Sequence, residues 1–513
     1  MNHWIIVPII LPAILAPFIV LAARHHIGIQ RAFSVAGVLA LIAISTGLAW
    51  QAADGTITLY QTGDWAAPFG IVLVGDRLST MMVLLTSVLA LFVLLYAIGS
   101  KWDERGRHFH ALFQFQLMGI LGAFLTGDLF NLFVFFEVLL IASYGLMIHS
   151  GGDQRLRAGV QYVLYNLLGS TLFLFALGSI YAETGTLNMA DLAVRVAEVG
   201  PEATVGIRVA AVLLLMVFAI KAALAPLHFW LPSSYSEAPG PVAALFAIMT
   251  KVGAYAIIRV YTMIFHPELE VTMGLHDTWL LPAALVSLVI GMVGVLAAKH
   301  LDRLVAFSVI GSMGMVMVAI SLMSEAGIAA ALYYIIHSTL AAAALFLIVD
   351  LVKTGRAGLT LVAAPPVSGA ALTAGLFFVA AITMAGLPPL SGFVGKLLIL
   401  EASFSTDMAV WVWAIILSSS LIAVVGFARA GSVVFWKGQS VEYEEDAVLP
   451  DPPSTLAYAA VGGLVAMLIA HTIFAGHMHD YMQVMAEQLF APVDYISTVV
   501  ETPGKMSTTK EGH

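Results

Sequence analysis

The amino-acid sequence predicts an all-α integral membrane protein with about 14 transmembrane helices. Of its 513 residues, 60% are hydrophobic and 10% are charged, and the mean hydropathy is +0.97. Soluble domains carry about 25% charged residues. Apolar runs near 20 residues long recur along the chain, which is the length needed to cross a bilayer as a helix. These runs lack the ten-residue alternation of a membrane β-barrel, so that fold is excluded.

The first three spans are predicted at residues 4–22, 32–52 and 72–98, and they form an N-terminal segment over residues 1–108. The first run has no basic residues before it and no small-residue cleavage site after it. We therefore expect it to be retained as a span and not removed as a signal peptide.

The next ten spans form two segments of five. Spans at 109–126, 129–149, 159–182, 205–227 and 239–263 make up residues 109–263, and spans at 278–298, 303–323, 327–350, 369–403 and 408–435 make up residues 278–435. AIKAALAPL at 219–227 and AITMAGLPPL at 381–390 both end an apolar run at a proline. Because five spans separate these stretches, their orientations are opposite. We predict two inverted five-helix repeats with broken helices in spans 7 and 12.

The last span is predicted at 455–475, after the acidic stretch VEYEEDAVLPDPP. We assign residues 436–475 to an acidic inner loop and span 14. Residues 476–513 are more polar and are expected to form a frayed C-terminal tail.

The basic residues indicate the orientation. Loops after odd-numbered spans hold thirteen Lys and Arg residues, whereas loops after even-numbered spans and the tail hold four. The positive-inside rule then places both termini on the outer side. Arg77 and Arg259 lie near span ends and are expected to extend toward the membrane surface.

Glu137 is an acid within an apolar span, in GDLFNLFVFFEVLLIASYGLM. An ionisable side chain near the bilayer centre costs about 2.5–3.5 kcal/mol and usually serves ion or proton movement. Its neighbours three and four residues away are apolar, so its partner must come from another helix. A purely structural ion pair is the alternative interpretation.

Three lysines also lie within predicted spans. Lys221 precedes Pro226 in VFAIKAALAPLHFWLP, beside a predicted helix break. Lys251 lies near the middle of its span, and Lys396 follows GLPPLSGFVG. Broken helices at membrane depth are typical of ion and substrate paths. Extension of Lys221 or Lys251 to the membrane surface is the alternative, and it is harder for the central Lys251.

His337 lies in the apolar run ALYYIIHSTLAAAALF. Its ordinary pKa near neutrality suits a proton relay, although a hydrogen-bonded packing role is equally compatible with the sequence. HTIFAGHMHD at 471–480 offers possible metal ligands, but its position at a span end favours a solvated loop. There are no cysteines, no phosphate-binding glycine loop and no hydrolase arrangement, so we expect no bound cofactor and no direct use of ATP.

These residues resemble the antiporter-like family of membrane subunits, which includes proton-pumping subunits of respiratory complex I, subunits of membrane-bound hydrogenases and large subunits of Mrp-type Na+/H+ antiporters. The similar motifs are FFEVLLIASYGLM, the stretch from Lys221 to Arg259, KHLDRLVAFSVIGSMG and GLPPLSGFVGK. Within the family, the sequence is most similar to the D subunits of Mrp antiporters. Some complex I subunits carry glutamate where Lys396 stands, and the longest members extend well beyond span 14, so we expect neither group.

The resemblance implies roles for the intramembrane charges. Glu137 and Lys221 would form the ion pair of a first half-channel, Lys251 would be a central relay, and His337 and Lys396 would complete a second half-channel. Moving Glu137 toward or away from Lys221 would switch that lysine between holding and releasing a proton.

The resemblance also implies a subunit of a secondary Na+/H+ antiporter and not an enzyme, in the bacterial inner membrane beside other hydrophobic subunits. Na+, H+ and the lipid bilayer are its expected partners, and nucleic acid is not. The alternatives are a redox-driven proton pump that uses the same charges and a structural scaffold that uses none of them.

Overall fold

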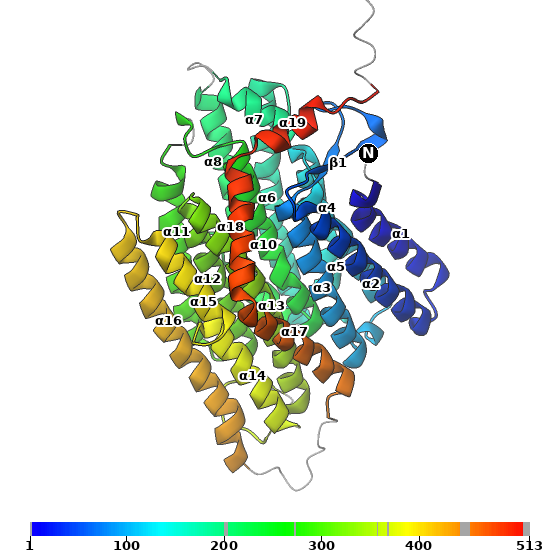
Figure 1. Ribbon diagram of the computed structural model, residues 1–513. Coiled ribbons are helices and arrows are strands. Elements are labelled where there is room, and N and C mark those ends of the chain that lie inside the picture. The colour runs from blue at the N-terminus through cyan, green and yellow to red at the C-terminus, as the bar shows by residue number, and fades with distance from the viewer. Residues whose placement is uncertain are drawn as a thin grey trace, which may run out of the picture.

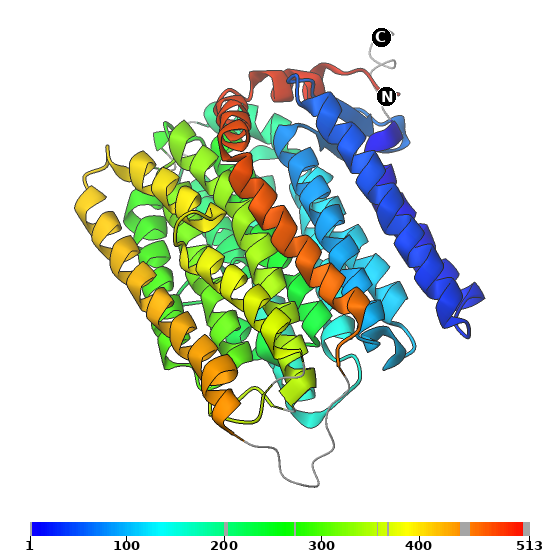
Figure 2. The same ribbon diagram turned by 60° about the horizontal axis from the view of Figure 1, so that its bottom comes forward.

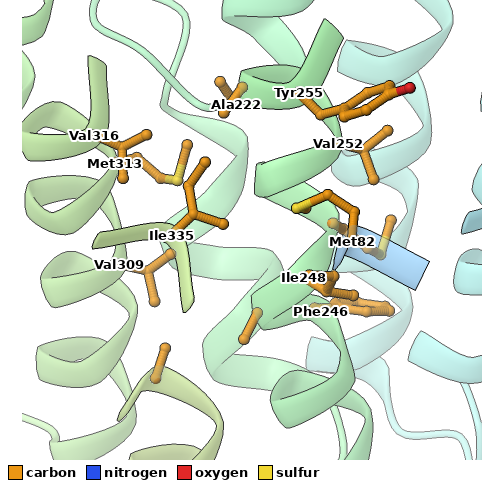
Figure 3. Packing of buried hydrophobic residues seen from close by; sticks show 14 of the residues in the cluster. Met82, Ala222, Phe246, Ile248, Val252, Tyr255, Val309, Met313, Val316 and Ile335 are labelled. Atoms are coloured by element: carbon orange, nitrogen blue, oxygen red, sulfur yellow. The ribbon is translucent and has the colours of Figure 1, made fainter. Parts of the chain in front are cut away.

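Three long helices form the centre of the molecule: α10 (Gly240–Met263), α12 (Leu301–Ser321) and α13 (Glu325–Arg356). The computed structural model describes residues 3–199, 204–270, 273–356, 358–366, 369–441 and 452–505. Nearly every residue of the most apolar part of these three helices is buried. Figure 3 shows the packing, with Ile248 and Val252 of α10 facing Val309 and Met313 of α12 across Ile335 of α13. Side chains on α10 and α13 are therefore held inside the protein and away from lipid.

The peripheral helices surround this centre. Only a third of the most apolar part of α2, α6 and α16 is buried, as expected for helices that face lipid. In Figure 2, α1 and α2 lie along one side of the bundle and α16 lies along the opposite side. These helices, with those that connect them to the centre, are α1 (Val7–Ala22), α2 (Ile27–Ala52), α3 (Arg77–Gly99), α4 (Phe109–Leu125), α5 (Leu129–Met147), α6 (Asp153–Thr184), α7 (Met189–Ala197), α8 (Thr204–Lys221), α9 (Trp230–Glu237), α11 (Leu281–Ala297), α14 (Ala370–Ala385), α15 (Ser391–Ser403), α16 (Ala409–Gly431) and α17 (Thr455–Ile473).

The predicted all-helical membrane fold is confirmed at this level. In the described part of the chain, ten helices are long and apolar enough to cross a membrane, and α1, α4 and α14 are shorter apolar helices. Most of the predicted acidic loop, residues 442–451, lies outside the described residues.

A small hairpin departs from the prediction that span 3 begins at residue 72. Strand β1 (Thr58–Gln61) pairs antiparallel with β2 (Val72–Gly75), with Thr58 opposite Gly75 and Gln61 opposite Val72. The helix begins only after Asp76, whose side chain accepts a hydrogen bond from the Ser79 amide in a capping box. The apolar run at 72–74 is thus a buried strand, which hydropathy alone does not distinguish from the start of a helix.

The tail predicted to be frayed is helical over most of its described length. It forms α18 (Ala475–Phe490) and α19 (Val493–Glu501). Met482, Met485, Ala486 and Leu489 lie at helical spacing and are buried, and α18 packs along α13 (Figure 1). The prediction was wrong because an amphipathic helix with many polar residues can still bury one apolar stripe.

Arg259 does not extend to the surface as predicted. It is 3% exposed, and its guanidinium forms a two-pronged ion pair with Asp76, with N–O distances of 2.7 and 2.8 Å. Its guanidinium carbon also lies 5.2 Å from the ring of Tyr495 on α19. Burial acts to raise the pKa of Asp76, but the charge and hydrogen bonds of Arg259 hold that pKa below its usual range. This buried pair therefore joins α10 to the hairpin end of the bundle.

Candidate functional site

Glu137 lies in the third turn of α5, a helix that begins where Asp128 accepts a hydrogen bond from the Asn131 amide at 2.8 Å. Its carboxylate accepts a hydrogen bond from the hydroxyl of Ser170 on α6. The partner of Glu137 thus comes from another helix, as the sequence indicated. Among the described residues, no Lys, Arg or His nitrogen lies within 4 Å of Glu137.

Lys221 is the last residue of α8 and is 6% exposed. Its ammonium donates a hydrogen bond to Asn166 of α6 at 3.2 Å and lies 5.5 Å from the ring centre of Phe136. Asn166 and Ser170 are one turn apart on α6, so they lie on the same face of that helix. A cavity of about 10 Å³ lies between these groups, close to the size of one water molecule. The structure therefore brings Glu137 and Lys221 into one cluster, with each bonded to α6.

The chain after Lys221 leaves the helix and resumes it at Trp230. Other parts of the protein bond the freed backbone groups. The indole of Trp230 donates to the carbonyl of Ile220 at 3.0 Å, and the amide of Ala225 donates to the hydroxyl of Ser287 on α11 at 2.8 Å. Backbone groups freed by this interruption are therefore hydrogen-bonded to other parts of the protein, as non-helical backbone at membrane depth requires.

Lys251 lies on α10 and is completely buried. Within the described ranges, neither its Nζ atom nor the adjacent Thr250 hydroxyl has a hydrogen-bond partner. Buried polar groups are nearly always hydrogen-bonded, so such a group needs an explanation, often a functional one. Helix α10 contacts both α8, which carries Lys221, and α13, which carries His337. Lys251 is thus on the helix between the two other groups of charges.

His337 and Lys396 belong to a second cluster around the GLPPLSGFVGK stretch. Helix α14 ends at Ala385, α15 begins at Ser391, and the hydroxyl of Ser391 lies 3.0 Å from Nδ1 of His337. The ammonium of Lys396 donates to the Ala385 carbonyl at 2.6 Å and to the Ser420 hydroxyl of α16 at 2.8 Å. The break thus places a buried lysine against the carbonyl end of α14. The C-terminal end of a helix favours a positive charge.

Two glycines of the same stretch make room for these side chains. Gly386 has φ +75°, and a Cβ there would lie 2.6 Å from the Lys396 side chain. A Cβ on Gly392 would lie 2.8 Å from the His337 ring. Both distances are shorter than real Cβ contacts, so a larger residue at either position would force a neighbouring group to move, and the positive φ of Gly386 also favours glycine.

Sequence reasoning missed His471 as part of this cluster. It is buried near the end of α17, and its ring stacks on Tyr333 at 4.2 Å between centres. Tyr333 precedes His337 by one turn on α13. The only sequence signal was the HTIFAGHMHD stretch, whose interpretation as a solvated loop was wrong for His471 because α17 continues through it. Among the described residues, no three His, Cys, Asp or Glu side chains are grouped closely enough to hold a metal ion.

Comparisons with known proteins agree with this architecture. A family model described as NADH:quinone oxidoreductase/Mrp antiporter, transmembrane, matches residues 126–423. The chain is 37% identical to the D subunit of a probable K+/H+ antiporter of Rhizobium meliloti strain 1021, over 98% of both chains. It is 38% identical to the D subunit of the Na+/H+ antiporter of Alkalihalophilus pseudofirmus, over 98% of this chain and 100% of that protein. A chain of the Mrp complex from Dietzia sp. DQ12-45-1b is similar in structure, with a TM-score of 0.85 at 26% identity over 98% of this chain and 100% of that chain.

Proposed function

Because this chain belongs to the NADH:quinone oxidoreductase/Mrp antiporter family, we propose that it is a subunit of a multi-subunit antiporter that exchanges Na+ or K+ for protons. The support is the similarity over nearly the full chain to subunits named for both exchanges. The proton gradient supplies the energy, so the subunit is a transporter component and not an enzyme. The redox-driven alternative is not favoured, since these full-length relatives are named as antiporter subunits.

The proposed topology has fourteen spans with both termini on the outer side. Each predicted span corresponds to one observed helix or helix pair, with α8 in span 7 and the pair α14–α15 in span 12. Interruptions after Lys221 and after Ala385 fall at equivalent places in residues 109–263 and 278–435. They support the two inverted repeats with a broken helix in each.

The observation that carries the mechanism is that each interruption places a buried lysine against polar groups of a neighbouring element. In the first cluster, Glu137 and Lys221 bond to Ser170 and Asn166 and not to each other. This arrangement corresponds to the separated pair of a switching cycle. When Glu137 approaches Lys221, the carboxylate stabilises the ammonium and the lysine holds its proton. When they separate, the desolvated lysine releases it.

The released proton would move through Lys251 to His337 and then to Lys396. Ser391 orients the His337 ring, and the Ala385 carbonyl and Ser420 hydroxyl hold the Lys396 ammonium in its protonated form. The stacked Tyr333 and His471 rings lie beside this second cluster. Movement of the cation in the opposite direction completes the exchange.

A vesicle assay tests the proposal. The whole gene cluster is expressed in cells that lack other Na+/H+ and K+/H+ antiporters, and respiration acidifies the lumen of inverted vesicles. Addition of Na+ or K+ should make the lumen alkaline, and Lys396→Ala should abolish this response at normal protein level. Lys437→Ala, which changes an exposed lysine, is the matched control. Proton pumping driven by an electron donor without any cation response would favour the redox-driven alternative.

A further inference from the structure

A polar cavity of about 610 Å³ opens where α9, α11 and α13 end and α6 and α12 begin. Helix α6 runs from this cavity to Thr184 and then to α7, so the cavity lies at the opposite end of the bundle from α7 and α19. In the proposed topology this end is the inner face. The charged and polar lining includes Gln154, Glu237, Lys299, His300, Asp302 and Lys353.

A narrower space of about 20 Å³ lies next to this cavity and shares part of its lining. Both spaces are lined by Asp302, Lys353 and Leu359, and the narrower one reaches Asp350. A space of this volume is large enough for one water molecule. The two neighbouring spaces therefore bring a water-sized cavity beside Asp350 close to the proposed inner face.

Asp350 lies on α13 and is 4% exposed. Its Oδ2 atom accepts hydrogen bonds from the Tyr96 hydroxyl at 2.9 Å and from the Trp102 indole at 2.8 Å. Within the described part of the chain, Oδ1 accepts no hydrogen bond and no basic side chain forms an ion pair with this carboxylate. Asp350 is thus a buried carboxylate with one free oxygen beside a water-sized space.

The N-terminus of α10 lies against Asp350. A Cβ on Gly240, the first residue of α10, would be 2.4 Å from the Asp350 Cβ and 2.9 Å from Oδ1. The positive end of the helix dipole favours a nearby negative charge. Lys251 follows eleven residues later on the same helix, roughly 16 Å along its axis. Helix α10 therefore connects the environment of Asp350 to that of the central lysine.

We propose that Asp350 is the proton-exchanging carboxylate of the inner face, which passes protons between the path through Lys251 and this cavity. The proposal rests on the proposed antiport function and deepens it by locating the inner opening of the path. A buried carboxylate without an ion pair is costly unless it is compensated or protonated. Here two neutral donors and a helix terminus compensate the charged form, and the free Oδ1 can take up a proton without loss of either hydrogen bond.

The surroundings favour a proton over an alkali cation as the ligand. Hard cations take six or more oxygen ligands, whereas Oδ2 is already occupied by two hydrogen-bond donors. The narrow space is also lined by Lys353, whose positive charge disfavours an alkali cation even though Asp302 and Ser236 offer oxygen atoms there. A proton needs only the one free carboxylate oxygen.

Transport by the assembled complex in inverted vesicles gives the first test. Asp350→Asn preserves an acceptor for Tyr96 and Trp102 but removes the group that binds the proton, and it should lower exchange at least tenfold. Asp350→Glu should restore a substantial part of the rate. Glu325→Gln, at the other end of the same helix and exposed, should exchange like wild type. Wild-type exchange by Asp350→Asn would overturn the proposal.

The chain contains no cysteine, which permits a second test that does not depend on transport. In Asp350→Cys, the introduced thiol should react with Ag+ in inverted vesicles, where the inner face is exposed, and this reaction should protect it from alkylation after unfolding. Ile248→Cys in the packed core should remain unprotected. Equal protection of the two introduced thiols from alkylation, or no protection at position 350, would refute the proposed inner opening even if exchange itself is observed. If the wild-type complex shows no exchange, the proposed function fails, and the thiol test still decides whether ions reach position 350.

Discussion

Substitution of Gly392 by alanine tests whether the His337–Ser391 contact is needed for exchange. The added Cβ would lie 2.0 Å from the Thr383 carbonyl oxygen, 2.8 Å from Cε1 of His337 and 3.0 Å from its Nε2. Atoms in contact pack at about 3.5–4.0 Å, so α15 must move by roughly 1.5 Å, mainly away from the Thr383 carbonyl of α14. Overpacking of this kind costs about 1–3 kcal/mol, which a protein of this size can tolerate while folded.

The same movement would lengthen the 3.0 Å contact between His337 and Ser391. A displacement of 1 Å in a reacting arrangement can cost about 100-fold in rate, and we expect a loss of this size in cation-dependent alkalinisation of inverted vesicles. Gly375→Ala on α14 is the matched control, because a Cβ there meets nothing within 4 Å. Normal complex assembly, measured by co-purification of the other subunits, is required for both variants. An assembled Gly392→Ala complex that exchanges at the wild-type rate would refute the proposed role of this contact.

The remaining predictions concern the first cluster and the ion pair at the hairpin end. Ser170→Ala removes the hydrogen bond to Glu137. Because a bond to a charged group contributes about 1.5–3 kcal/mol, exchange in the vesicle assay should slow by about 10- to 100-fold. Ser179→Ala is the control, since its hydroxyl bond is exposed on the same helix, and it should have no effect. Arg259→Met leaves the buried Asp76 carboxylate without its partner and should lower the free energy of unfolding by about 3–5 kcal/mol, measured by denaturant titration of the purified complex. Replacement of Asp76 by leucine in the Arg259→Met background should recover part of that loss, and a double variant less stable than Arg259→Met would contradict this account.

Much of the fold could be predicted because the length and apolarity of a membrane-crossing helix are local properties of the sequence. The runs that form α10, α12 and α13 are visible in hydropathy. The family was recognisable from the stretch containing Lys221 and Lys251 and from GLPPLSGFVGK, and the match to residues 126–423 confirms it. The proline and glycine content around Ala385 also indicated an interruption at that place.

Other features depended on which partner a segment or side chain meets in the fold and not on the hydropathy of the segment itself. The run at 72–74 forms a strand because β1 is available to pair with it. Helix α18 forms because α13 offers a surface for Met482, Met485 and Leu489. Arg259 is buried because Asp76, 183 residues earlier in the chain, lies beside it. Hydropathy does not report contacts with residues distant in the sequence, so these three predictions failed.

The sequence by itself determined which residues are ionisable within apolar segments and where the helices must be interrupted, since both follow from local composition and backbone chemistry. Tertiary structure alone decided what each group meets: Ser170 for Glu137, Asn166 for Lys221, Ser391 for His337, and Tyr333 for His471, 138 residues away. It also decided that Asp350 lies beside a water-sized space while Lys251 is enclosed without a partner in the described structure. The physical reason is that a buried charge is stabilised by side chains and helix ends that packing brings together. Because these groups are far apart in the sequence, local sequence patterns do not predict which of them will be in contact.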